Sequence, residues 1–249
     1  MRRLYPNRPG IDPSTAVDVY EAYRPEDPLA PLVRINMVSA LDGRVVGDDG
    51  VSGTLGGDGD GQAFFAMRHN ADGVVAGAGT VRAEGYGPMR VRDGWGERRR
   101  ADGRHGPASI VIVTRSLDLD LESRVFTEAV APTIVLTTTD APTERVAAVE
   151  DAGGLVVAAG EGDVNLTAGF EQLRSDHGLA HLLVEGGPNL NGQILTAGLA
   201  DEVCVTLAPA LAGGDDGKRI VDGLTERRDV TLAQVLEADG ELLLTYRCG

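Results

Sequence analysis

The chain has 249 residues, of which 42% are hydrophobic and 24% are charged, and these proportions exclude the disordered and fibrous classes of protein. Its formal net charge of −15 opposes binding to nucleic acid or to an anionic membrane surface. No apolar run reaches the length of a membrane span, and the amino terminus lacks the apolar core of a secretory signal. Two cysteines, Cys204 and Cys248, are too few for a disulfide framework, and they lack the spacing of metal ligands. We therefore expect a reduced, cytoplasmic protein without a metal site.

Residues 1–31 are rich in proline and predict an extended N-terminal arm, followed by one domain over residues 32–249. Beyond the arm, short apolar runs that end in turn residues are typical of strands covered on both faces. These runs span residues 32–38, 73–77, 109–114, 133–137, 155–159, 181–185 and 202–208.

Segments with helical spacing alternate with these runs, at residues 61–70, 143–151, 165–175 and 188–197. The alternation predicts an α/β fold in which helices flank a mostly parallel central sheet. Near the C-terminus, two strand-like runs joined at Asp239 and Gly240 predict an antiparallel hairpin.

Two clusters follow the first predicted strands, at the carboxyl ends where open α/β sheets bind ligands. The first is SALDGR at residues 39–44, in which Asp42 is either a functional carboxylate or part of an ordinary turn. The second begins with Gly77 and Gly79, which allow the backbone to approach a phosphate. A helix that begins near Thr80 would direct free N–H groups toward that phosphate.

Two further clusters follow later strands. Arg115, between Thr114 and Ser116, either binds a phosphate such as the 2′-phosphate of NADP or belongs to a charged turn. In the segment VEGGPNLNGQIL, Gly186 to Pro188 begin a helix whose amide groups and dipole suit a diphosphate without a lysine. Glu185 ends a buried strand, so it either forms a structural ion pair or acts on the substrate.

The segment at residues 90–107 has six arginines, three acidic residues and no periodicity. It is either a solvated loop or a flap close to an anionic ligand.

Taken in order, these motifs resemble the bacterial pyrimidine reductases of riboflavin biosynthesis, a reductase domain family with the dihydrofolate reductase fold, and especially its stand-alone, actinobacterial-type members. The likeness covers about residues 32–247. The matching segments are SALDGR (39–44), MRHNADGVVAGAGTVRAEGYGP (67–88), LLVEGGPNLNGQIL (182–195) and LADEVCVTLAPALAGGDDGKRI (199–220).

The resemblance implies an NADPH-dependent reductase that transfers a hydride to the ribose C1′ of 5-amino-6-(5-phosphoribosylamino)uracil, and a homodimer. It implies that Asp42 and Glu185 are the catalytic residues, and a carboxyl group in such an apolar site would have a raised pKa. The implied substrate-binding residues are Asn36, Ser52, Thr54, Arg68 and Glu185. The implied cofactor-binding residues are Val38, Gly77, Gly79, Thr80, Arg82, Glu84, Thr114, Arg115, Ser116, Gly186, Gly187, Pro188, Asn189 and Leu190, in a loop and helix start that extend to Gln193.

Three departures from the family pattern leave the substrate open. Asn36 stands where many members have lysine, Thr54 stands where they have tryptophan, and the fused deaminase module is absent. Relatives that share Asn36 are linked to a pterin-reducing activity. Reduction of dihydrofolate, and a non-catalytic NADP-binding protein, therefore remain as alternatives.

Overall fold

The structure is a computed structural model and describes residues 1–6, 15–47, 51–213 and 218–249. The chain forms two compact units. Unit 1 contains residues 1–26, 32–70 and 185–249, and unit 2 contains residues 27–31 and 71–184. Within the described residues, no helix has the length and apolar character needed to cross a membrane.

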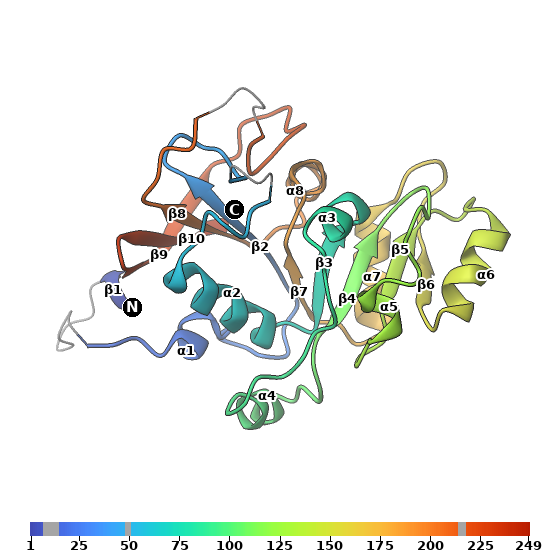
Figure 1. Cartoon of the computed structure of the whole chain (residues 1–249), viewed down its shortest axis with the longest axis horizontal. Helices are drawn as coiled ribbons and strands as arrows, with labels where there is room; N and C mark the ends of the chain where they lie inside the picture. Colours follow the sequence, from blue (N-terminus) through green and yellow to red (C-terminus); the bar gives the residue numbers. More distant parts are fainter. Residues whose placement is uncertain (7–14, 48–50, 214–217) are drawn as a thin grey trace. The chain divides into compact units, whose positions relative to one another are not determined.

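Unit 1 is built on strands in the order β1-β9-β10-β8-β2 (Figure 1). Their bounds are β1 Arg2–Tyr5, β9 Val230–Ala238, β10 Glu241–Cys248, β8 Glu202–Ala208 and β2 Leu32–Ala40. β2 and β8 are parallel, and the other pairs are antiparallel. The helices of this unit are α1 Val19–Tyr23, α2 Asp58–Asn70 and α8 Pro188–Thr196.

The C-terminal hairpin forms at the predicted turn. Asp239 and Gly240 have φ values of 52° and 88°, and Asp and Gly are residues that tolerate this left-handed backbone in a two-residue hairpin turn. The predicted arm contributes β1, which pairs with β9, and α1, while its residues 7–14 lie outside the described part of the chain. The hairpin is therefore covered by the arm at β9.

Unit 2 is a parallel sheet in the order β7-β3-β4-β5-β6. Its strands are β7 His181–Val184, β3 Gly73–Gly77, β4 Ser109–Val113, β5 Ile134–Thr137 and β6 Leu155–Ala158. Its helices are α3 Ala78–Ala83, α4 Gly96–Ala101, α5 Arg124–Thr127, α6 Thr143–Asp151 and α7 Leu166–Ser175. Gly169 of α7 packs so closely on β5 that a Cβ atom there would lie 2.6 Å from Leu136.

The predicted fold class is confirmed, because the sheet is mostly parallel and only its N- and C-terminal strands are antiparallel. All seven apolar runs are strands, since β-branched residues in short runs fit a sheet buried on both faces. The sequence prediction missed the short elements β1, α1, α4 and α5. Each has too few residues for a periodic pattern to appear.

Candidate functional site

A buried ion pair joins two of the predicted substrate-binding residues in unit 1. Glu185, directly after β7, accepts hydrogen bonds from Arg68 of α2 at both oxygens, with Nε–Oε1 and Nη2–Oε2 distances of 2.7 and 2.6 Å. The Glu185 side chain is only 4% exposed. The Arg68 guanidinium also lies 3.9 Å from the centre of the Phe64 ring, one helical turn earlier. Glu185 and Phe64 therefore fix the plane of the guanidinium, a geometry suited to binding a planar or anionic group.

Asn36 places a polar side chain in the middle of β2. It is 7% exposed, and its Oδ1 atom has no hydrogen-bond partner among the described residues. Alternate residues of a strand share a face, so Asn36 lies on the same face as Arg34 and Val38. Arg34 on this face donates to the main-chain oxygen of Tyr23 in α1. Buried polar atoms in proteins normally have partners, so Oδ1 is a candidate acceptor for a ligand donor.

Ser52 and Thr54 lie in the segment that precedes α2. The amide of Leu55 donates to the Ser52 main-chain oxygen at 3.0 Å, which closes a turn just before the helix. Both residues therefore lie at the opposite end of α2 from Arg68.

The environment of Asp42 differs from the apolar site that was predicted for it. It is exposed after β2, and its Oδ2 atom accepts from the Gly213 amide at 2.6 Å. Arg44 donates to the Gly213 main-chain oxygen, so this loop is tied to the loop after β8. The Gly213 amide, with further backbone donors, lowers the pKa of Asp42. The expectation of a raised pKa is thus wrong at Asp42, because amide donors surround the carboxylate in place of apolar side chains.

The predicted diphosphate site of unit 1 is a glycine turn followed by α8. Gly186 has a φ of +89°, and a Cβ atom there would lie 3.3 Å from the Met37 sulfur. A cis peptide bond joins Gly186 to Gly187, which is the N-cap residue of α8, and no side chain caps this helix end. Pro188 occupies the first turn, Leu190 is buried, and Asn189 accepts a hydrogen bond from Gln193. The amides of this uncapped first turn could bind an anion.

In unit 2, the predicted cofactor residues meet at the carboxyl edge of the parallel sheet. α3 follows β3 directly, and Gly79 has open space where a side chain would lie. Glu84 ends this helix, and its amide donates to the Thr80 main-chain oxygen at 2.9 Å. Arg82 reaches from α3 to the turn after β4, where Nη1 donates to the Asp118 main-chain oxygen at 2.5 Å.

Three arginines gather at that turn. Arg115 is exposed and pairs with Asp163 at 3.0 Å, and Arg145 of α6 donates to the Ser116 main-chain oxygen at 2.5 Å. The sequence analysis did not identify Arg145, because α6 lies far along the chain. The hydroxyls of Thr114 and Ser116 accept from the amides of residues 117 and 118, so they stabilise the turn itself.

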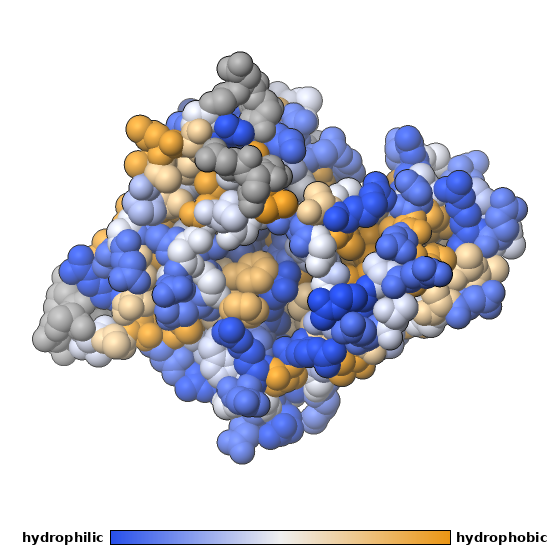
Figure 2. Space-filling model, in the orientation of Figure 1, coloured by the Kyte–Doolittle hydropathy of each residue, from blue (hydrophilic) through white to orange (hydrophobic). Residues whose placement is uncertain are grey.

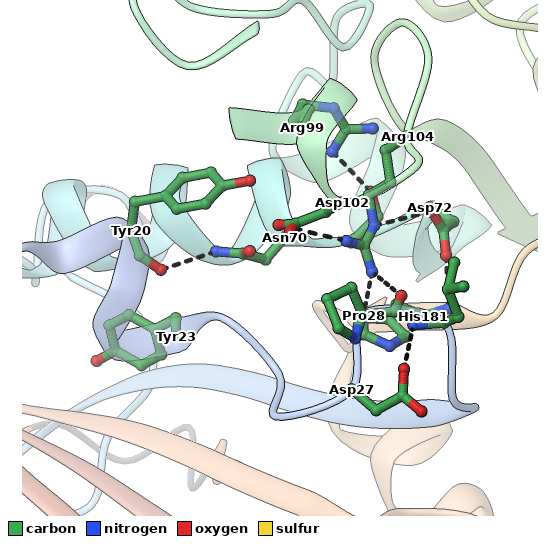
Figure 3. A network of polar contacts seen from close by, with 12 residues as sticks. Tyr20, Tyr23, Asp27, Pro28, Asn70, Asp72, Arg99, Asp102, Arg104 and His181 are labelled. Carbon is green, nitrogen blue, oxygen red and sulfur yellow. Dashed lines mark hydrogen bonds and ion pairs between the residues drawn. The ribbon is translucent and has the colours of Figure 1, made fainter. Parts of the chain in front are cut away.

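The arginine-rich segment at residues 90–107 is anchored at the other edge of the unit 2 sheet. Arg104 is 5% exposed and donates to Asp72 at 3.0 Å, and to the Pro28 main-chain oxygen and His181 Nδ1 at 2.7 Å each (Figure 3). Asp72 precedes β3 and His181 begins β7, so these contacts lie at the amino ends of the strands.

Arg99 is also buried and donates to the main-chain oxygens of Ala71 and Gly106 at 2.9 Å each. The surface over α4 is hydrophilic (Figure 2). The segment is therefore a solvated loop with a short helix, and two buried arginines, Arg99 and Arg104, anchor it to the rest of unit 2. Within unit 2, it is not a flap at the carboxyl edge where the predicted cofactor residues lie.

Comparisons with known proteins identify the family of the chain. A family model described as the RibD C-terminal domain matches residues 31–244. The 2,5-diamino-6-ribosylamino-4(3H)-pyrimidinone 5′-phosphate reductase of Methanothermobacter thermautotrophicus is 33% identical over 196 residues, which cover 78% of this chain and 85% of that protein.

Two solved structures share the fold. A pyrimidine reductase-like protein of Corynebacterium diphtheriae has a TM-score of 0.82 at 24% identity, over 94% of this chain and 99% of that chain. A riboflavin biosynthesis reductase of Saccharomyces cerevisiae has a TM-score of 0.65 at 18% identity, over 92% of this chain and 95% of that chain. At these identities the likeness shows the fold alone.

Proposed function

Because the chain belongs to the RibD C-terminal domain family, we propose that it is an NADPH-dependent reductase that converts the ribosyl group of a phosphoribosylaminopyrimidine to a ribityl chain in riboflavin biosynthesis. The observation that carries this proposal is the bidentate Arg68–Glu185 pair. It unites two positions that match the substrate-binding residues of the family, in a buried and rigid geometry.

The predicted substrate is 5-amino-6-(5-phosphoribosylamino)uracil. The name of the Methanothermobacter relative favours a second candidate, 2,5-diamino-6-ribosylamino-4(3H)-pyrimidinone 5′-phosphate. The two compounds share the phosphoribosylamino group that is reduced and differ at one substituent of the pyrimidine ring. The reaction at the sugar is the same for both.

Different residues of unit 1 bind the substrate and orient the side chains that bind it. Arg68 holds the substrate in a fixed plane, and Glu185 holds Arg68 in place. Asn36 Oδ1 accepts a hydrogen bond from an N–H group of the substrate, which both candidate rings provide. The nicotinamide supplies the hydride when the cofactor is bound. Asp42 ties two loops together, so Glu185 is the remaining candidate for polarising the reacting group.

Two features support NADPH as the cofactor. The uncapped N-terminus of α8 in unit 1 suits a diphosphate. In unit 2, the guanidinium groups of Arg82, Arg115 and Arg145 surround the turn after β4 and suit a 2′-phosphate.

We also propose that the protein is a cytoplasmic homodimer. Both cysteines are free, which agrees with a reducing compartment. β1 covers β9, so the C-terminal hairpin is not the edge of the unit 1 strands. One face of these strands carries half-buried apolar side chains, and a second copy would cover them. They are Val203, Leu207, Leu242, Leu244 and Tyr246.

The test is loss of NADPH absorbance with three compounds: the uracil, the diaminopyrimidinone and dihydrofolate. We expect turnover with a phosphoribosylaminopyrimidine and none with dihydrofolate. Turnover with dihydrofolate alone would contradict the proposal. NADPH binding without turnover of any compound would indicate a non-catalytic binding protein.

A further inference from the structure

The segment from residue 218 to residue 229 contacts α8 at several points within unit 1. Near the start of the helix, the Asp222 amide donates to the Pro188 main-chain oxygen at 3.0 Å. Near its end, Arg228 donates to the Thr196 main-chain oxygen at 3.3 Å. The segment therefore runs in the same direction as the helix, and Ile220 contacts its first turn through Asn191.

The segment lies very close to α8 at Gly192, where a Cβ atom would lie 1.8 Å from the Asp222 main-chain oxygen. Only glycine permits this packing without a shift of the backbone. The segment is thus fixed against α8.

A buried amide lies at the junction of this segment and the glycine turn. Asn191 is fully buried and donates from Nδ2 to the Ile220 main-chain oxygen at 2.7 Å. Its Nδ2 atom lies 3.7 Å from the position of a Cβ atom on Gly186. Its Oδ1 atom has no hydrogen-bond partner among the described residues. The buried acceptor beside the glycine turn needs a donor, and a water molecule held between Oδ1 and an anionic ligand would supply it.

Two cations come directly before this junction. Lys218 is the only lysine among the 249 residues, and Arg219 follows it. Both are exposed, and neither forms an ion pair with a described residue. Two residues of extended chain span about 7 Å, so Lys218 and Arg219 lie within about this distance of Ile220, whose main-chain oxygen contacts the first turn of α8.

The electrostatics of this arrangement favour an anion. The N-terminus of a helix is its positive end, so cations placed there repel the helix dipole. An anion bound between the cations and the amide groups attracts both, and these attractions offset the repulsion between them. In a chain with a net charge of −15, the two consecutive cations also offset the general repulsion of an anionic ligand.

We propose that Lys218 and Arg219 bind the diphosphate of the dinucleotide cofactor against the N-terminus of α8. This inference rests on the proposed function, because it assigns a second set of contacts to the same cofactor. It revises the sequence prediction that the helix dipole and glycine amides hold the diphosphate without a lysine.

The test measures dissociation constants of NADPH and NADH by fluorescence titration over a range of salt concentrations. The variant is K218Q/R219Q. The matched control is R227Q/R228Q, which removes the same charge from the same segment near the C-terminal end of α8. K218R/R219K is the conservative variant.

We expect K218Q/R219Q to weaken both coenzymes about tenfold or more, with a smaller dependence on salt, because both share the diphosphate. The control and the conservative variant should bind within about twofold of the unmodified protein. An Arg115→Gln variant should weaken NADPH more than NADH, since only NADPH carries the 2′-phosphate.

Unchanged affinity of K218Q/R219Q, or equal weakening in R227Q/R228Q, would overturn the inference and leave the proposed function intact. Failure of the unmodified protein to bind either coenzyme would contradict the proposed function itself. Inorganic pyrophosphate, as a competitor of NADPH, should lose potency in K218Q/R219Q alone.

Discussion

At the scale of single residues, the pair between Arg68 and Glu185 bears on both interpretations of the buried carboxylate, a structural ion pair and a role toward the substrate. A glutamate at the end of an apolar strand is costly to bury alone, and the guanidinium offsets that cost. The pair is therefore structural in its contacts. Its position also matches the substrate site of the family, so the same contact orients Arg68, the residue that we propose to bind the substrate.

The Glu185→Gln variant tests this orienting role. We expect kcat/KM to fall about tenfold to a hundredfold, the range for loss of a charge-assisted hydrogen bond. Affinity for NADPH should change less than about twofold, because the proposed cofactor contacts come from other residues. Steady-state kinetics and NADPH titration measure the two effects.

Glu171→Gln is the matched control for this variant, since Glu171 is exposed on α7. It should leave both quantities unchanged. Full turnover in Glu185→Gln would show that the carboxylate has no part in the reaction.

At the scale of elements, the start of α2 is stabilised by a residue of β10, a strand far away in the sequence. The helical spacing of the sequence predicts a helix from residue 61. The helix instead begins at Asp58. The buried Glu241 carboxylate of β10 accepts from the amides of Gly57 and Asp60 at 2.6 and 3.0 Å. Glu241 thus caps α2 from another element.

Replacement of Glu241 tests the cap. We expect Glu241→Ala to lower the free energy of unfolding by about 1–2 kcal/mol, because two amides lose their acceptor. Urea denaturation measures the change, and Glu226→Ala, at an exposed position, is the control. Equal stability of Glu241→Ala and the control would show that water replaces the carboxylate at no cost.

The same helix start is sensitive to pH at Asp60. Burial raises the pKa of Asp60, and the charge of Glu241 adds to this effect, while a hydrogen bond with Thr206 opposes it. The neutral form is therefore favoured in the folded state. This contribution to stability is present below the unfolded pKa and is lost as the pH rises through the raised pKa.

Asp60→Asn stays neutral throughout, so its stability relative to the unmodified protein should increase as the pH rises from about 3 to 7. Urea denaturation at several pH values measures the trend. The control is Asp58→Asn, an exposed position in the same turn. A relative stability that falls with rising pH would contradict the raised pKa.

At the scale of the whole molecule, the proposed dimer depends on the apolar face of unit 1. Leu244 lies on the central strand β10, opposite Val205 of β8 and Val235 of β9. A charge on this face would be buried without a partner in a dimer. We expect Leu244→Glu to be a monomer by light scattering and sedimentation, whereas Leu29→Glu, at an exposed position, should leave the assembly unchanged. A dimeric Leu244→Glu protein would place the interface elsewhere.

The strands and helices of the fold could be predicted from the sequence, because apolar runs and helical spacing are local properties that specify them directly. The sequence also placed the glycine turns, since Gly186 and Gly240 have positive φ values that other residues rarely adopt.

The contacts between distant side chains could not be predicted from the sequence and are seen only in the folded protein. Arg68 and Glu185 are 117 residues apart, and Glu241 caps a helix 181 residues earlier in the chain. Arg104 is a further example. The composition of residues 90–107 is typical of a solvated loop, but Arg104 is buried by hydrogen-bond partners from three other segments. Contacts between residues so far apart depend on how the elements pack, and no periodic pattern in the sequence encodes that packing.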